Sequence, residues 1–288
     1  SKGEMNYLIL HINCPDQHGI IAQFTGVLYE NGVNVLNLEQ HVETEEKIFF
    51  MRIYADMSNI EISQEDLCDL LNILGKKTNA SVKFYYPEQK LNVGIFVSKE
   101  SAPLYDLLIK HQSGELRCNI PCIISNHIAL ESIAIQFNIP FYHLPVSHST
   151  KEEQESKVTA ILNKEKVHLL VLARYMQILS EKFVDNFYGR IINIHHAFLP
   201  AFKGSNPYRR AWERGVKMIG ATAHYVTKNL DEGPIIEQDV VSVSHQHSVK
   251  EMIQAGRDIE RRVLTSAVKS HIEHRIILDG NRTIIFHS

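Results

Sequence analysis

The sequence predicts an α/β protein of two domains, the first with the order strand–helix–strand–strand–helix–strand and the second with a mainly parallel sheet. At 288 residues the chain is long enough for about two domains of roughly 150 residues each. Residues 1–86 contain runs in which every second residue is apolar, whereas residues 91–288 contain short apolar runs that alternate with helical stretches. The polar segment PEQK separates the two patterns. We therefore predict domains at 1–86 and 91–288, joined by a linker at 87–90.

Composition and charge argue against several classes of function. With 44% hydrophobic and 22% charged residues, the chain has the composition of a soluble globular protein. Its formal net charge of -3 argues against a nucleic-acid partner, because phosphate neutralisation needs a basic surface. No apolar run reaches the ~18 residues of a membrane span, and no leader precedes the first strand. We expect a cytoplasmic protein with no membrane partner and with Met5 as its natural first residue.

The cysteines and histidines predict neither a disulfide framework nor a metal site. Two of the four cysteines fall on one predicted strand, where four residues hold them ~13 Å apart, too far to bridge. None of the 16 histidines belongs to a clean zinc-binding spacing. We therefore expect no metal, and reduced thiols typical of the cytosol at Cys14, Cys68, Cys118 and Cys122.

The elements of the first domain follow from the spacing of apolar residues. Half-buried strands are predicted at residues 8–13, 35–42, 47–54 and 80–85, and helices at 20–28 and 64–74. Gly32 ends the first helix, and the acidic turn ETEE joins the second and third strands. This order is the ferredoxin-like arrangement βαββαβ.

The segments CPDQHGI and ENGVNV, which follow the first strand and the first helix, resemble the ACT regulatory domain over residues 6–86. The resemblance implies a small amino-acid effector, with glycine or methionine as first candidates, and a homo-oligomer. Its ligand positions fall on Asp16, Gly19, Ile20 and Asn34. In the alternative interpretation, Asp16 and Asn34 only make turn and cap hydrogen bonds. The family usually has Arg or Lys where this chain has Gln17.

In the second domain, strands alternate with helices. Strands are predicted at residues 91–97, 119–125, 140–144 and 168–172, and helices at 103–110, 129–137 and 151–162. In mainly parallel sheets of this kind, ligands bind beyond the carboxyl ends of the strands. A further apolar segment, INIHHAFLP, ends with polar residues at that edge. Its Asn193 and His195 lie two apart and thus on one face of a strand, where an amide and an imidazole can act on one carbonyl group.

Three separated motifs resemble the fold of the 10-formyltetrahydrofolate transferases and hydrolases over residues 91–288. They are LARYMQILS, NIH-x-x-x-LP-x-F-x-G and DEGP. The resemblance implies a formyltransferase-type, Rossmann-like domain whose catalytic residues are Asn193, His195 and Asp231. It places folate binding on Arg174, Tyr175, Met176, Ile178, Leu179, His196, Val226 and Leu230. For His196, packing on the opposite face of the strand is an alternative.

Within this fold, the pattern is typical of the deformylases. Glycinamide ribonucleotide transformylases have a glycine-rich phosphate loop after the first strand, whereas this chain reads VSKESAP there. Methionyl-tRNA formyltransferases lack an ACT domain, and transformylases usually read NIHP rather than NIHH. The resemblance implies hydrolysis of 10-formyltetrahydrofolate to formate and tetrahydrofolate, which supplies formate for purine synthesis, without a cofactor. A His-Cys pair common in deformylases is missing near Ser101. The alternatives are a transformylase and a non-catalytic folate or amino-acid sensor.

Overall fold

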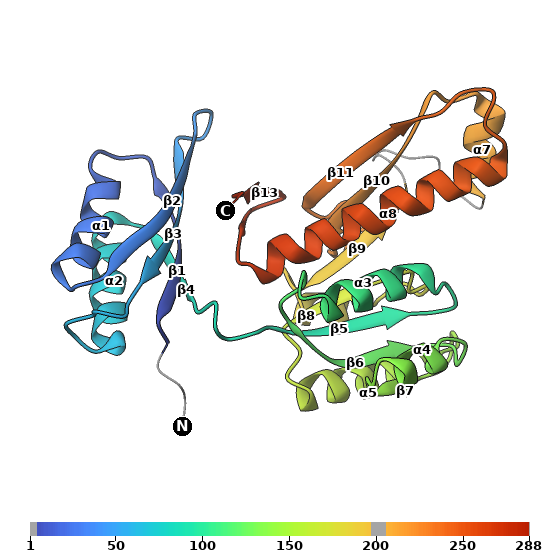
Figure 1. The fold of residues 1–288 in the computed structure, drawn as a ribbon, viewed down its shortest axis with the longest axis horizontal. Helices are drawn as coiled ribbons and strands as arrows, with labels where there is room; N and C mark the ends of the chain where they lie inside the picture. Colours follow the sequence, from blue (N-terminus) through green and yellow to red (C-terminus); the bar gives the residue numbers. More distant parts are fainter. Residues whose placement is uncertain (1–4, 197–205, 288) are drawn as a thin grey trace. The chain divides into compact units, whose positions relative to one another are not determined.

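The protein, seen in a computed structural model that describes residues 5–196 and 206–287, forms two compact units (Figure 1). The first comprises the described residues up to Lys90 together with 273–277 and the end of the chain from Ile284. The second comprises Leu91–Ile272 and Leu278–Thr283. The expected extra residues before Met5 lie outside the described residues. Two C-terminal pieces thus belong to the first unit, although the sequence-based boundary places everything after residue 90 in the second.

The first unit has the predicted βαββαβ order. Its elements are β1 (Tyr7–Pro15), α1 (Ile20–Glu30), β2 (Asn34–Glu43), β3 (Ile48–Asp56), α2 (Gln64–Thr78) and β4 (Ser81–Tyr85). The strands form an antiparallel sheet in the order β2-β3-β1-β4. Alternate residues of β1 pack with residues of both helices in one core that includes Leu8, Leu10, Ile12, Phe24, Leu28, Leu67 and Leu71. The ferredoxin-like fold predicted for this part of the chain is confirmed.

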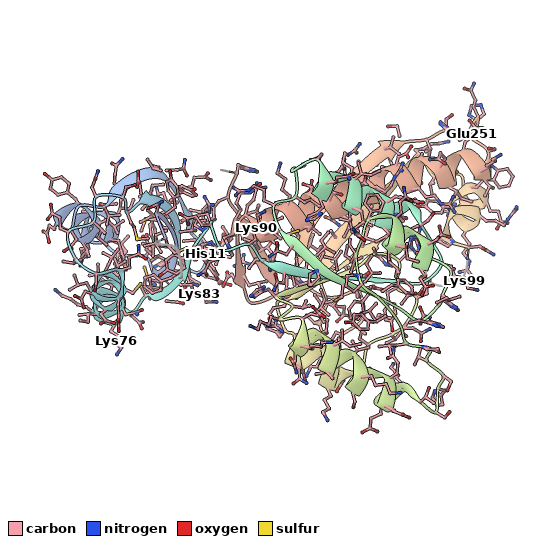
Figure 2. The ribbon with its side chains drawn as sticks, turned by 60° about the horizontal axis from the view of Figure 1, so that its bottom comes forward. His11, Lys76, Lys83, Lys90, Lys99 and Glu251 are labelled. Carbon is pink, nitrogen blue, oxygen red and sulfur yellow. The ribbon has the colours of Figure 1, made fainter. Side chains whose placement is uncertain are left out.

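Local sequence explains the limits of α2. Ser63 caps its start by accepting a hydrogen bond of 3.0 Å from the Asp66 amide, an interaction worth ~1 kcal/mol. Lys76, exposed in the last turn and labelled in Figure 2, places a positive charge near the negative end of the helix dipole. Asn79 then adopts a left-handed conformation with φ 56° and ends the helix.

Buried polar side chains of the first unit hold its C-terminal piece. Arg52 donates from Nε to the carbonyl of His274 at 2.8 Å and from Nη2 to that of Glu273 at 3.0 Å. His11 (Figure 2) lies with Nε2 2.7 Å from the same His274 carbonyl. Burial lowers the pKa of His11 to about 4, so its ring is neutral at pH 7 and donates this hydrogen bond from Nε2. These contacts explain why residues 273–277 belong to the first unit.

The second unit has a seven-stranded sheet in the order β11-β10-β9-β8-β5-β6-β7. Strands β5 to β9 run parallel to one another, β10 runs antiparallel to β9, and β11 runs antiparallel to β10. The strands are β5 (Asn92–Val97), β6 (Asn119–Ser125), β7 (Phe141–His143), β8 (Leu169–Leu172), β9 (Ile191–His195), β10 (Met218–Tyr225) and β11 (Ile235–Ser242). The mainly parallel sheet predicted from the sequence is confirmed.

Helices cover both faces of this sheet (Figure 1). They are α3 (Ala102–Gln112), α4 (Glu131–Gln136), α5 (Lys151–Lys164), α6 (Glu181–Asn186), α7 (Pro207–Arg214) and α8 (Val249–Ile272). Residues of α5 and α6 share a core with β5, β6, β8 and β9. On the other side, α8 packs on β9, β10, β11 and α3, and Thr265 of α8 donates to Asp106 of α3 at 2.9 Å. The chain ends in a hairpin of β12 (Ile276–Asp279) and β13 (Arg282–Ile285).

The strand order has a switch point between β5 and β8, because the chain proceeds from β5 outward through β6 and β7 and then returns to β8 and β9. Ligands of such sheets bind at the carboxyl edge near this point. Segment 174–180 follows β8 directly, and His195 ends β9, so both lie at this edge. Among the described residues, no helix is long and apolar enough to cross a membrane.

Candidate active site

The structure brings Asn193, His195 and Asp231 to one place. Asn193 and His195 lie on one face of β9, and Asp231 lies in the loop between β10 and β11. Asp231 Oδ1 is 3.5 Å from His195 Nδ1, and the two side chains are 32% and 18% exposed. The side-chain amide of Asn193 makes no hydrogen bond to another residue within 5–196 and 206–287. A carboxylate, an imidazole and a side-chain amide with no hydrogen bond to the described residues thus lie together at a partly exposed edge of the sheet.

Backbone constraints fix the loop that carries Asp231. Asp231 has a φ of 57°, a left-handed conformation that aspartate tolerates better than most residues. The Tyr225 amide donates to the Pro234 carbonyl at 2.9 Å, which closes the loop. A Cβ atom on Gly233 would lie 1.7 Å from the Tyr225 carbonyl oxygen, so only glycine allows this close approach. The DEGP motif therefore sets the position of Asp231 through its glycine and its proline carbonyl.

His196 packs against the imidazole of His195. Its ring is stacked on that of His195, with 4.9 Å between centroids and 26° between planes. The predicted alternative, packing on the opposite face of the strand, is wrong because β9 ends at His195 and the strand alternation stops there. Burial, together with the neighbouring His195 and Arg174, lowers the pKa of His196 to about 4 although Asp231 acts in the opposite direction, so the ring is neutral at pH 7.

The segment from Arg174 to Ser180 is held by side chains from distant parts of the chain. The Met176 amide donates to Ser98 Oγ at 2.9 Å, and the Ser180 hydroxyl donates to Glu155 at 2.8 Å. Gln154 donates to the Tyr175 hydroxyl at 3.1 Å. Because hydrogen bonds hold the segment at Tyr175, Met176 and Ser180, its backbone has a fixed position beside the switch point of the sheet.

Arg174 begins this segment in a left-handed conformation with φ 64°. Its guanidinium forms an ion pair of 2.9 Å with Glu260 of α8, which also accepts a hydrogen bond of 2.9 Å from the Tyr208 hydroxyl. Burial raises the pKa of Glu260, whereas Arg174 and Tyr208 favour its charged form. A Cβ on Gly256 would lie 2.0 Å from the Tyr208 hydroxyl, so this glycine makes room for the network. The predicted folate residue Arg174 is thereby tied to α8.

The other residues predicted to bind folate divide into exposed and packed side chains. Met176, Ile178 and Leu230 are 65%, 65% and 67% exposed, which leaves apolar surface available on both predicted folate segments. Leu179 and Val226 pack against one core cluster that also contains the buried Tyr175. This shared cluster brings segment 174–179 and the loop after β10 together, as the resemblance predicts for a pterin site.

Sequence reasoning missed five polar residues of the site, which are Ser98, Gln154, Glu155, His224 and Glu260. All five are buried, which is unusual for these residue types without a partner. His224 had a usable signal, because the strand GATAHYV is otherwise nearly apolar and leads into the DEGP turn. It lies opposite Asn193 in the pairing of β9 and β10, and its Nε2 is 4.0 Å from Asp231 Oδ1.

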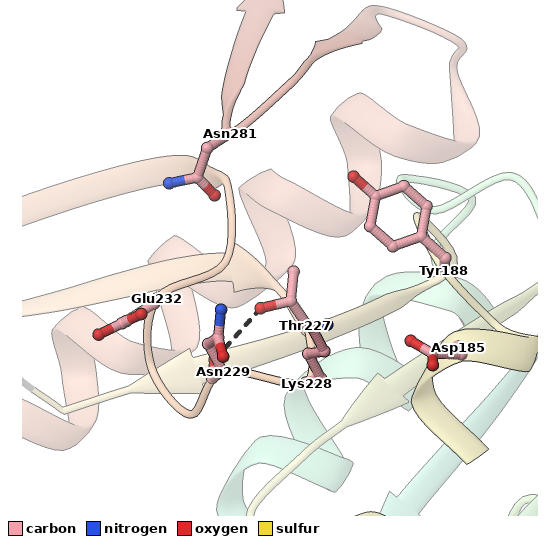
Figure 3. Close-up of a pocket in the computed structure, with 7 residues that line it drawn as sticks. All are labelled: Asp185, Tyr188, Thr227, Lys228, Asn229, Glu232 and Asn281. Atoms are coloured by element: carbon pink, nitrogen blue, oxygen red, sulfur yellow. Dashed lines mark hydrogen bonds between the residues drawn. The ribbon is translucent and has the colours of Figure 1, made fainter. Parts of the chain in front are cut away.

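A pocket of about 490 Å³ lies beside the loop that carries Asp231 (Figure 3). Polar side chains from the end of α6, the loop itself and the hairpin turn line it, namely Asp185, Tyr188, Thr227, Lys228, Asn229, Glu232 and Asn281. None of the three predicted catalytic residues is among them. The pocket is therefore distinct from the cluster of Asn193, His195 and Asp231.

The residues predicted to bind an effector do not form one site in a single chain. Ile20 is buried in the core, whereas Asp16 and Asn34 are exposed and Gly19 starts α1 with φ 76°. The strand register places Asn34 level with Tyr7 at one end of β1, whereas Asp16 follows Pro15 at the other end. Nine residues of strand separate them by ~30 Å.

Comparisons with known proteins agree with this architecture. The formyl transferase family matches residues 91–268, and the ACT domain family matches residues 8–62. The formyltetrahydrofolate deformylase of a Synechocystis species is 47% identical over 277 residues, which cover 96% of this chain and 97% of that protein. A crystal structure of a formyltetrahydrofolate deformylase from Pseudomonas syringae pv. tomato superposes with a TM-score of 0.94 at 38% identity, covering 99% of this chain and 96% of that one.

A glycinamide ribonucleotide transformylase from Symbiobacterium toebii is more distant, with a TM-score of 0.64 at 28% identity over 70% of this chain and 97% of its own. The fold and the site thus define an enzyme of the formyl transferase type that carries an added ACT domain. The full-length matches identify the family as well as the fold class. The chain belongs to the formyltetrahydrofolate deformylase family, as its motifs predict.

Proposed function

We propose that the protein hydrolyses 10-formyltetrahydrofolate to formate and tetrahydrofolate, and so supplies formate for purine synthesis. The observation that carries this proposal is the cluster of Asn193, His195 and Asp231 at the carboxyl edge of β9 in a chain whose full-length relatives are deformylases. The chain is a hydrolase rather than a non-catalytic sensor. A transformylase, the other alternative, corresponds to a more distant relative.

The three side chains can divide the reaction among them. Asn193 donates its amide hydrogen bond to the formyl oxygen as this atom becomes an oxyanion. Asp231 accepts a proton from the attacking water and faces His195 Nδ1. His195 Nε2 is then the atom that donates a proton to N10 of the folate as the carbon–nitrogen bond breaks.

The exposed apolar side chains beside this cluster suit a pterin. Met176, Ile178 and Leu230 lie on the two segments that share a core cluster, and apolar contact is what a flat heteroaromatic ring requires. The ion pair of Arg174 with Glu260 holds the first of these segments in place. We therefore assign the folate to the space between segment 174–179 and the loop at 226–230.

The reaction proposed here requires water but neither a second substrate nor a metal, because Asn193, His195 and Asp231 supply each step. We expect the purified enzyme to release formate from 10-formyltetrahydrofolate with no added acceptor, at a rate unchanged by a chelator. Formate and tetrahydrofolate should appear in equal amounts. A requirement for glycinamide ribonucleotide would contradict the proposal, and loss of turnover in the chelator would contradict the metal-free mechanism.

We also place the enzyme in the cytosol and assign its first unit a regulatory role. All four cysteines are free thiols, which suits a reducing compartment. The ACT domain supports binding of a small amino acid, with glycine or methionine as first candidates. Because Asp16 and Asn34 lie at opposite ends of β1, a ligand that touches both needs two copies of the chain. This geometry supports a homo-oligomer in which two first units pair.

A screen of amino acids against the full-length enzyme tests this role. We expect one of them to bind and to change the rate of formate release, with a coupling of ~1–3 kcal/mol between the two sites. Asn34→Ala should weaken that binding while the rate without effector stays unchanged. The exposed Asn59→Ala is the matched control. A monomer in sedimentation, or the absence of any binding amino acid in calorimetry, contradicts the regulatory role.

A further inference from the structure

His224 is a buried titratable residue to which the mechanism above gives no part. It lies on β10 opposite Asn193 of β9 and is 2% exposed. Directly paired residues of antiparallel strands project to the same face, so its ring lies on the face that carries Asn193 and His195. Its Nε2 atom has no hydrogen-bond partner among residues 5–196 and 206–287, and it lies 4.0 Å from Asp231 Oδ1. A buried polar atom in this condition requires an explanation.

The hydrogen bond made by the other ring nitrogen determines which nitrogen of His224 carries the proton. Nδ1 lies 2.9 Å from the backbone carbonyl oxygen of Tyr225, and a carbonyl only accepts, so Nδ1 carries the hydrogen. Burial lowers the pKa of His224, although the Tyr225 carbonyl and Asp231 act in the opposite direction. The ring is therefore neutral near pH 7, and its Nε2 presents a lone pair toward the active site.

The Asp231 carboxylate, like His224 Nε2, can only accept a hydrogen bond, so two hydrogen-bond acceptors face each other. They cannot bond to one another, but one water molecule can donate a hydrogen to each. With hydrogen bonds of ~2.8 Å to both atoms, acceptors 4.0 Å apart subtend an angle of ~90° at the water oxygen, close to the angle between its own bonds. A water held in this way directs both hydrogens into the protein and leaves its lone pairs free to attack.

We propose that His224 and Asp231 together bind the hydrolytic water, with His224 as a further catalytic residue that orients it. This inference rests on the proposed hydrolysis of 10-formyltetrahydrofolate. The water oxygen forms a bond to the formyl carbon while Asp231 takes one of its protons. The oxyanion then collapses, the bond between the formyl carbon and N10 breaks, and N10 receives a proton through His195. Formic acid leaves and ionises, and His224 keeps its Nδ1 proton throughout.

The test compares two substitutions of His224 in the full-length enzyme. His224→Leu keeps an apolar volume but removes the acceptor, and His224→Gln keeps an acceptor oxygen on a side chain of similar reach. We expect His224→Leu to lower kcat about 10- to 100-fold while the affinity for tetrahydrofolate, measured by calorimetry, stays unchanged. His224→Gln should be at least about fivefold more active than His224→Leu. His224→Met serves in place of the leucine variant if the latter does not fold.

A double substitution separates a shared water from a general structural effect. Two groups that act on one water give non-additive losses, so Asp231→Asn combined with His224→Leu should be at most about threefold slower than Asp231→Asn alone. Losses that multiply, a His224→Leu enzyme with more than half of the wild-type kcat, or equal activity of the Leu and Gln variants overturn the inference. Wild-type enzyme that releases no formate in the same assay overturns the proposed function, and this inference falls with it.

Discussion

Asp231→Asn is expected to lower kcat by ~10²–10⁴-fold, the usual loss when a general base is removed. The amide keeps the shape of the carboxylate, so the loop closed by Gly233 and Pro234 should keep its backbone. What the variant loses is the charge that faces His195 Nδ1 at 3.5 Å and the ability to take a proton from water. Formate release under saturating substrate measures kcat, and KM should change little because the folate contacts remain.

Glu232→Gln is the matched control for this prediction. It converts the neighbouring carboxylate of the same loop into an amide, but the Glu232 side chain lines the pocket beside the loop, which none of Asn193, His195 and Asp231 lines. We expect it to retain nearly full activity. An Asp231→Asn enzyme that keeps more than about a tenth of the wild-type kcat contradicts the role assigned to Asp231. Equal losses in both variants would indicate a general effect of loop charge instead.

Local sequence was sufficient to predict most of the fold. The helix α2 begins at Gln64 as predicted, after the cap Ser63, but it continues to Thr78, beyond the predicted end at residue 74, before the left-handed Asn79 ends it. Likewise, β9 ends at His195, so Asn193 and His195 lie at the carboxyl edge of the sheet. These features depend on residues near in sequence, and their physical causes are visible in a single chain segment.

The parts that could not be predicted depend on partners far apart in the chain. Met176 is held by Ser98 across 78 positions, and Arg174 by Glu260 across 86. No periodic pattern links such pairs, because each partner is a single polar residue inside an apolar element. The same holds for the C-terminal piece that Arg52 and His11 hold in the first unit. These hydrogen bonds are tertiary, and only the folded chain reveals them.

Asn193→Ala is expected to lower kcat by ~10²–10³-fold through the loss of one oxyanion donor. Asn193 is half-buried and its amide makes no hydrogen bond within the described ranges 5–196 and 206–287, so the substitution leaves no protein partner there unsatisfied. Its effect on the free energy of unfolding should therefore be small. The loss should appear in kcat and in kcat/KM alike, because the oxyanion exists only near the transition state.

Ile194→Val separates this chemical effect from a disturbance of the strand. Ile194 is buried on the opposite face of β9, and removal of one methylene there typically costs about 1 kcal/mol of stability. We expect it to lower the melting temperature while kcat stays within about twofold of the wild type. Asn193→Ala should show the reverse pattern, a nearly unchanged melting temperature and a large loss of kcat. If the two variants lose activity in proportion to their loss of stability, Asn193 supports the strand and does not stabilise the oxyanion.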